Sequence, residues 1–356
     1  MSYSNEFDLI VFMNETVNIA RGLAIIAMVF GHVLSKDNYW VCLIYKWHMP
    51  LFFLFSGFFF DVGKYKIGPF CKRKVKTLYT PFVFWSFLYL CFHNFFARHG
   101  ICATQVIDFS QFKTFAFRIV TRMQQFEPLL GTFWFLTQLL FVNLLGYGVS
   151  KLIALCRLTH ESIANLALVV VFCIGAILFS KFNVTIYYQI NYVTLLATAF
   201  FFSGKLIHEV QTLGIFKFVI SGIVLLTCNN GFHEMIDLKY NDILLYYLVA
   251  ICGVIFIYNV SQILSKSSYI KNFFAYIGKR SLSIMILHFS SFKIVSYLIV
   301  LYGNKPMSAL SSHPVIPDMG GQRIMAYIVV GIFLPLLLDR CYCCLKNRVV
   351  FHKVKL

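Results

Sequence analysis

The segment RGLAIIAMVFGH, residues 21–32, joins a cation at Arg21 to an imidazole at His32 through ten uncharged residues. Such a run suits the hydrocarbon core of a bilayer, where ionisable side chains are costly and mark a functional site by default. On a helix, eleven positions are three turns plus about 20°, so both side chains lie on one face, roughly 16 Å apart along the axis. Taken separately, Arg21 can extend its charge to one headgroup region and His32 can lie in the other. Their shared face favours a joint role inside a helix bundle.

The composition of the whole chain points to the same environment. Of its 356 residues, 59% are hydrophobic and 13% are charged, whereas a soluble domain carries about 25% charged residues. We therefore predict an all-α polytopic membrane protein with its helices in one bundle. Windows of about 20 apolar residues give about ten transmembrane helices, near residues 17–35, 47–62, 77–97, 130–150, 163–180, 187–204, 214–230, 242–260, 278–300 and 322–340.

The basic residues predict the orientation. They gather after the second span, before the ninth span and after the tenth, and loops rich in Lys and Arg face the cytoplasm. With an even number of spans, both termini are then cytoplasmic. We expect a single membrane-embedded domain over residues 1–356, with its core at 17–340 and a short basic cytoplasmic tail at 341–356. The three basic groups are Lys64, Lys66, Lys72, Arg73, Lys74 and Lys76; Lys266, Lys271, Lys279 and Arg280; and Arg340, Lys346, Arg348, Lys353 and Lys355.

The charge and the cysteines argue against two other classes of protein. The net charge of +17 is scattered over loops rather than gathered on a soluble fold, so nucleic-acid binding is not expected. Cysteines such as Cys91, Cys173 and Cys252 lie inside predicted spans, where Cys behaves as a small apolar residue. The cluster CYCC at 341–344 has no partner ligands elsewhere in the chain, so no metal site is expected.

A second polar interruption opens the next span, in KWHMPLFFLFSGFFF at residues 46–60. His48 and Pro50 begin this aromatic helix, and Ser56 and Gly57 interrupt it. Proline near a helix start and small residues at a packed interface both have structural explanations. The histidine that precedes the aromatic run has none of this kind.

Several segments together resemble the membrane-bound acyltransferase family 3, the O-acyltransferases that modify bacterial glycans. The resemblance runs from residue 18 to about 290, and its first two motifs are the specific ones. Asn18 stands where the family often has an acidic residue, and the cluster at 72–76 is rich in Lys, with Arg73 as its one arginine. The segments are NIARGLAIIAMVFGH (18–32), WHMPLFFLFSGFFF (47–60), FCKRKVKTLYTPF (70–82), TFWFLTQLLFVNLL (132–145) and YIGKRSLSIMILH (276–288).

The resemblance implies a membrane O-acetyltransferase that moves an acetyl group from cytoplasmic acetyl-CoA to a hydroxyl of a cell-surface glycan or its lipid-linked oligosaccharide precursor. It implies a multi-pass protein of the bacterial cytoplasmic (inner) membrane. His32 is the candidate general base, since imidazole accepts a proton near neutral pH. For His48 three roles stay open: it orients His32, it binds the acceptor, or it only begins the second helix. The candidate ligands of CoA phosphates are Arg21, Lys72, Arg73, Lys74 and Lys76; the candidate substrate contacts are Trp134, Glu127 and His288.

The alternative is a transporter or flippase for a glycan intermediate, a class that often contains internal repeats. In the second half of the chain, Arg280 and His288 are eight positions apart, about 80° off a common face, so the geometry of the first span is not repeated. A purely structural scaffold leaves the polar residues inside the spans without a role. The sequence leaves the identity of the glycan, the position acylated and the oligomeric state open.

Overall fold

A computed structural model describes residues 3–156, 160–209, 214–228, 231, 233–303, 305–317 and 320–353. Within these ranges helices dominate and the pairing of extended backbone is limited to one isolated bridge, between Ile186 and Ile190. Lys355 of the predicted basic tail and the last two residues of the predicted span at 214–230 lie outside the described residues. The helices are α1 (Tyr3–Val33), α2 (Tyr39–Tyr45), α3 (His48–Phe58), α4 (Ile67–Lys74), η1 (Val75–Tyr79), α5 (Thr80–Arg98), α6 (Phe109–Arg122), η2 (Pro128–Phe133), α7 (Trp134–Leu155), α8 (Glu161–Lys181), α9 (Tyr192–Glu209), α10 (Ile215–Thr227), α11 (Ile243–Leu264), α12 (Ser268–Lys279), α13 (Ser281–Tyr302), η3 (Met307–Ser311) and α14 (Gly321–Lys353).

Among the described residues, eight helical stretches are long and apolar enough to cross a membrane, and two shorter apolar helices accompany them. The predicted all-α polytopic membrane protein is thereby confirmed, and each predicted span falls on one of these stretches. The second and third begin earlier than predicted, because α2 leads into α3 and α4 continues into α5. The eight are Asn14–Val33, Tyr39–Phe58, Ile67–Arg98, Pro128–Leu155, Glu161–Lys181, Ile243–Leu264, Ser281–Tyr302 and Gly321–Lys346; the shorter two are Tyr192–Ile207 and Ile215–Thr227.

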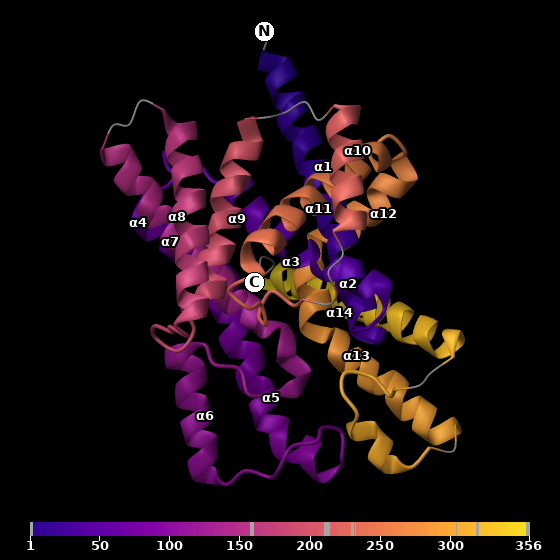
Figure 1. Cartoon of the computed structure of the whole chain (residues 1–356). Coiled ribbons are helices and arrows are strands. Elements are labelled where there is room, and N and C mark those ends of the chain that lie inside the picture. Colours follow the sequence, from indigo (N-terminus) through magenta and orange to yellow (C-terminus); the bar gives the residue numbers. More distant parts are fainter. Residues whose placement is uncertain are drawn as a thin grey trace.

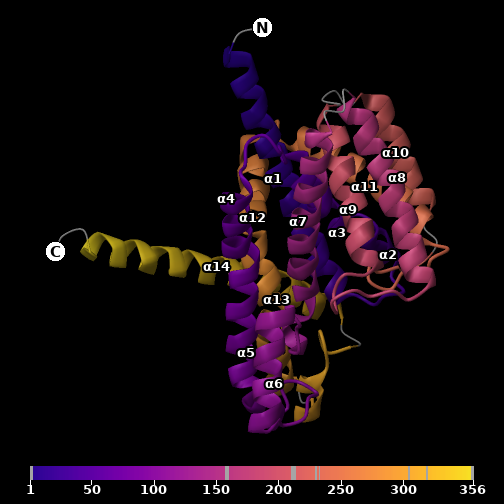
Figure 2. The same cartoon turned by 90° about the vertical axis from the view of Figure 1, so that its left-hand side faces the viewer.

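The helices form a bundle with α3, α9 and the C-terminal part of α1 inside it, while the N-terminal end of α1 projects beyond the other helices (Figure 1). Helix α1 packs along α12 and also contacts α3, α11, α13 and α14, while α9 packs between α3, α7 and α8. The basic helices α4 and α12 lie in the same half of the molecule, and α6 and the loop that holds η3 lie in the other (Figures 1 and 2). Helix α14 packs on α13 and leaves the bundle at a steep angle to the upright helices (Figure 2).

A pair of glycines lets α1 and α12 touch through their backbones. A Cβ on Gly278 would lie 1.8 Å from the carbonyl oxygen of Asn18, and a Cβ on Gly22 would lie 2.2 Å from that of Phe274. Small residues at such crossings allow membrane helices to approach closely. Because Arg21 precedes Gly22 and Lys279 follows Gly278, this close approach brings two cations from distant parts of the chain together.

Candidate active site

A cavity of about 760 Å³ lies between α1, α3, α4, α7 and the start of α13. Its polar lining includes two groups at the two ends of one face of α1, on which Arg21 and His32 are roughly 16 Å apart. The first group is cationic and the second contains histidines; apolar and aromatic side chains, among them Met28, Phe52 and Phe135, line the space between. The ion pair between Lys36 and Glu234, 3.0 Å apart, also lines the cavity. The cationic group is Arg21, Arg73, Lys74 and Lys279; the histidines are His32, His48 and His313.

The cationic end is held by polar side chains rather than by carboxylates. Arg21 Nη2 donates to Ser281 Oγ over 3.3 Å, and Lys74 Nζ donates to Asn143 Oδ1 over 2.6 Å. Arg73 Nη1 donates to the Tyr65 hydroxyl over 2.9 Å. Within the described ranges, no ion pair joins Arg21, Arg73 or Lys74 to an acidic side chain. Their positive charge is therefore not neutralised locally, which suits an anionic ligand.

The basic cluster divides into residues that line the cavity and residues that do not. Arg73 and Lys74 line the cavity, whereas Lys72 and Lys76 are exposed and do not line it. The π-helical turn η1 follows directly after Lys74, and turns of this kind are frequent at functional sites. Of the four lysines and arginines predicted here as phosphate ligands, the structure brings two to the cavity.

At the other end, His32 contacts three rings, one from α2 and two from α13. Its Nδ1 is 3.2 Å from the Tyr45 hydroxyl, with which it shares a hydrogen bond. Its ring stacks on His288 with centroids 5.4 Å apart and contacts Phe289 edge-on at 4.9 Å. His32 remains half-buried and faces the cavity, so its imidazole is both oriented and accessible.

The other two predicted histidines are fixed by backbone carbonyls. His48 Nδ1 donates to the Ile44 carbonyl over 2.9 Å, which leaves Nε2 unprotonated in the neutral ring. His48 lines the cavity, and its ring contacts that of Tyr45 with centroids 4.9 Å apart. His288 Nδ1 donates to the Met285 carbonyl over 2.9 Å. His288 is fully buried behind His32 and does not line the cavity.

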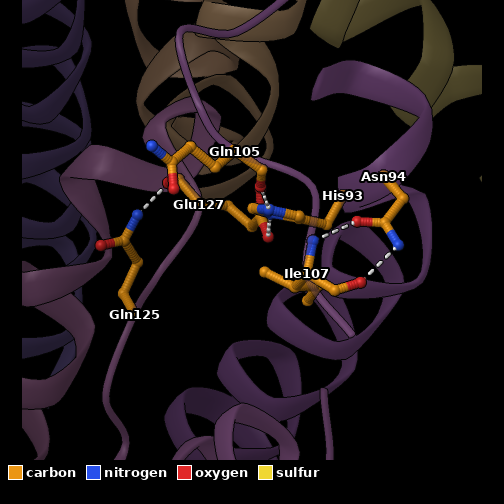
Figure 3. A network of polar contacts seen from close by, with 6 residues as sticks. All are labelled: His93, Asn94, Gln105, Ile107, Gln125 and Glu127. Carbon is orange, nitrogen blue, oxygen red and sulfur yellow. Dashed lines mark hydrogen bonds and ion pairs between the residues drawn. The ribbon is translucent and has the colours of Figure 1, made fainter. Parts of the chain in front are cut away.

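Trp134 lines the cavity, but Glu127 lies outside it in a separate polar network (Figure 3). Glu127 Oε1 is 2.7 Å from His93 Nδ1, both side chains are buried, and His93 Nε2 donates to the Gln105 carbonyl over 2.9 Å. Beside this pair, Asn94 exchanges two hydrogen bonds with the backbone of Ile107. Burial raises the pKa of Glu127, and the adjacent His93 opposes that shift. The network ties the loop before α6 to α5, and it gives Glu127 a structural partner.

Several polar residues of the site were not predicted from the sequence, and four of them contact or adjoin the predicted residues. Lys279 and Ser281 lie inside the quoted segment YIGKRSLSIMILH, and the basic–small spacing there is the signal that was available. Tyr45 and His313 had no such signal, because the first precedes the histidine motif and the second lies in a polar loop after α13. Within the described part of the chain, no group of three His, Cys, Asp or Glu side chains is placed to hold a metal ion.

Comparison with known proteins places this arrangement in a family. A family model described as an acyltransferase domain, acyltransferase 3, matches residues 14–338. The chain belongs to the acyltransferase 3 family. This acyltransferase is also 28% identical, over 171 residues, to the nodulation protein NolL of Sinorhizobium fredii (strain NBRC 101917 / NGR234). That match covers 44% of the chain and 41% of NolL. No solved structure matches the chain. Its helices and its family together make it a multi-pass membrane acyltransferase.

Proposed function

We propose that this acyltransferase transfers an acetyl group from acetyl-CoA to a hydroxyl of a cell-surface glycan or of its lipid-linked precursor. In this proposal the protein lies in a bacterial inner membrane with both termini in the cytoplasm. The basic helices α4 and α12 then face the cytoplasm, as the positive-inside rule predicts, and the donor enters from that side.

The observation that carries the proposal is the division of one cavity into a cationic end and a histidine end. The phosphates of CoA carry negative charge, and unpaired Arg and Lys side chains bind phosphate through charge-assisted hydrogen bonds. A long flexible acyl carrier can extend along the face of α1, past apolar side chains, and bring its thioester to His32. A flippase hypothesis has no corresponding support, because the family assignment is to acyltransferases.

The chemistry at His32 follows from its hydrogen bond to Tyr45. With the proton on Nδ1, His32 donates to the Tyr45 oxygen, and its Nε2 lone pair accepts the proton of the acceptor hydroxyl. The hydroxyl oxygen attacks the thioester carbonyl, the carbon–sulfur bond breaks, and the proton on Nε2 passes to the departing thiolate. The products are an acetyl ester and CoA, and the imidazole returns to its starting state.

His48, Trp134 and Glu127 have less direct parts in this scheme. His48 presents an unprotonated Nε2 next to Tyr45, so it orients the Tyr45–His32 pair or contacts the acceptor. Trp134 offers a flat apolar surface beside the acyl carrier or a sugar. Glu127, paired with His93 outside the cavity, supports the fold around the site.

The test uses the full chain purified into nanodiscs with acetyl-CoA labelled in the acetyl group. The acceptor is an envelope extract of glycans and lipid-linked oligosaccharides from the bacterium that encodes the chain. We expect label to move into the extract, and we expect CoA to bind more tightly than dephospho-CoA, which lacks one phosphate. Absence of transfer would contradict the proposal. The proposal would also be contradicted if the unaltered chain bound CoA and dephospho-CoA equally tightly and Arg21→Ala did the same.

A further inference from the structure

A buried lysine in α13 has no partner that explains its charge. Lys293 is only 6% exposed, and no carboxylate in the described ranges pairs with it. Its ammonium donates instead to two backbone carbonyls, those of Leu310 over 2.8 Å and Ser312 over 2.6 Å. A charge inside a membrane protein is costly to bury, and an apolar residue would fill the space without that cost. We therefore expect the contact between Lys293 and the loop at residues 310–312 to have a functional role.

A second buried side chain contacts the same loop further along the chain. Tyr327 of α14 is fully buried, and its hydroxyl shares a 2.7 Å hydrogen bond with Ser296 of α13. The same hydroxyl accepts from the backbone N–H of Ile316 over 3.4 Å. Lys293 and Tyr327 thus fasten the loop at residues 310–312 and at 316. The residue between these two attachments that faces the cavity with a titratable side chain is His313.

His313 lies next to the histidine end of the cavity. Its ring packs against Phe289 with centroids 4.8 Å apart, and the same Phe289 contacts His32 at 4.9 Å. His313 is exposed to the cavity, yet desolvation by the surrounding protein atoms, and then the charge of Lys293, lower its pKa to about 4. Its imidazole is therefore neutral near pH 7 and can both donate and accept a hydrogen bond.

The position of the loop favours one substrate over the other. The loop that holds η3 lies in the half of the molecule away from α12 and α4, which supply the cations (Figures 1 and 2). A neutral imidazole suits the hydroxyl groups of a sugar, whereas CoA phosphates call for the cationic end. We propose that His313 binds the sugar acceptor at the outer end of the cavity and that Lys293 positions His313 by holding its loop. This inference rests on the proposed function.

The experiment measures acetyl transfer as a function of the concentration of the same envelope extract, at saturating labelled acetyl-CoA. It uses three variants in nanodiscs: His313→Ala, Lys293→Met and the double variant. His313→Ala would remove a hydrogen bond between the neutral imidazole and an acceptor hydroxyl. The loss of such a bond should raise the half-saturating acceptor concentration by about 3- to 10-fold. The maximal rate and the affinity for CoA should stay within about twofold. Lys293→Met should shift the same parameter in the same direction, and the double variant should be no worse than His313→Ala, because the lysine acts through the histidine.

His99→Ala is the matched control, since His99 is an exposed histidine directly after α5 that does not line the cavity. An unchanged acceptor titration for His313→Ala, or a loss of CoA affinity as large as the loss of acceptor affinity, would overturn the assignment of His313. Additive effects of Lys293→Met and His313→Ala would overturn the positioning role. If His313 or Lys293 fails these tests while the unaltered chain and His99→Ala transfer acetyl normally, only this inference is overturned and the proposed function stands. If the unaltered chain transfers no acetyl, the proposed function and this inference both fail.

Discussion

The contact between α1 and α12 can be opened by one methyl group, and the consequence for donor binding is specific. In Gly278→Ala the new Cβ would lie 1.8 Å from the Asn18 oxygen, so the helices must separate by about 1.6 Å to reach the 3.4 Å of ordinary contact. Overpacking of this kind costs roughly 1–3 kcal/mol. The movement also stretches the 3.3 Å contact between Arg21 and Ser281. Since a misplacement of about 1 Å can cost about 100-fold in rate, we expect transfer to fall by about 10- to 100-fold.

The assay compares Gly278→Ala with Gly148→Ala, a change of the same size in the middle of α7. A Cβ on Gly148 meets nothing within 4 Å, so that variant should keep its activity and gain slightly in stability, as Gly to Ala changes do at unstrained sites. CoA affinity, acetyl transfer and the thermal unfolding midpoint are measured for both variants in nanodiscs. If Gly278→Ala matches Gly148→Ala in all three, the close approach does not position the cationic end and the reasoning fails.

Two further predictions concern the donor end and the orientation. Lys74→Met should weaken CoA binding about tenfold, because it removes a charge-assisted hydrogen bond. Lys72→Met, at an exposed position outside the cavity, should change CoA binding less than about twofold. Equal effects of the two changes on equilibrium binding would show that the CoA phosphates do not bind at Lys74. In intact cells an impermeant maleimide should leave the cysteines of the tail unlabelled, since the tail is cytoplasmic in this proposal. Cys102, in the loop after α5, should also stay unlabelled, because it is buried and burial raises the pKa of its thiol to about 11. In inverted vesicles the maleimide should label the exposed cysteines of the tail, and labelling of the tail from outside the cell would reverse the topology. The tail cysteines are Cys341, Cys343 and Cys344.

The spans and the helix face of the opening motif were predictable because they depend on local properties. A stretch of about 20 apolar residues must be helical in lipid, since its backbone polar groups can be satisfied only internally. The helical period then places Arg21 and His32 on one face, and both line the cavity. The phosphate-binding role of the cluster that contains Lys74 was implied by the resemblance to the family, and it stays a prediction.

The remaining features depend on contacts between residues far apart in the chain. Lys74 reaches the cavity because Asn143 of α7 accepts its hydrogen bond, while its neighbour Lys72 points elsewhere, and local composition does not distinguish them. Glu127 finds His93 across 34 positions. His313 lies at the cavity on a loop that Lys293 and Tyr327 both contact. Each of these pairings is a tertiary contact without a periodic signal in the sequence.

The most direct test of the account is acetyl transfer by His32→Ala in nanodiscs, with labelled acetyl-CoA and the envelope extract, beside CoA binding by the same sample. A general base contributes about 10²–10⁴-fold to the rate, so transfer should fall by at least about 100-fold while CoA affinity stays within about twofold. His32→Gln keeps a hydrogen-bonding side chain but supplies no comparable base, and it should be nearly as inactive. Normal transfer by His32→Ala would contradict the account and leave His32 with only a packing role against Tyr45 and His288.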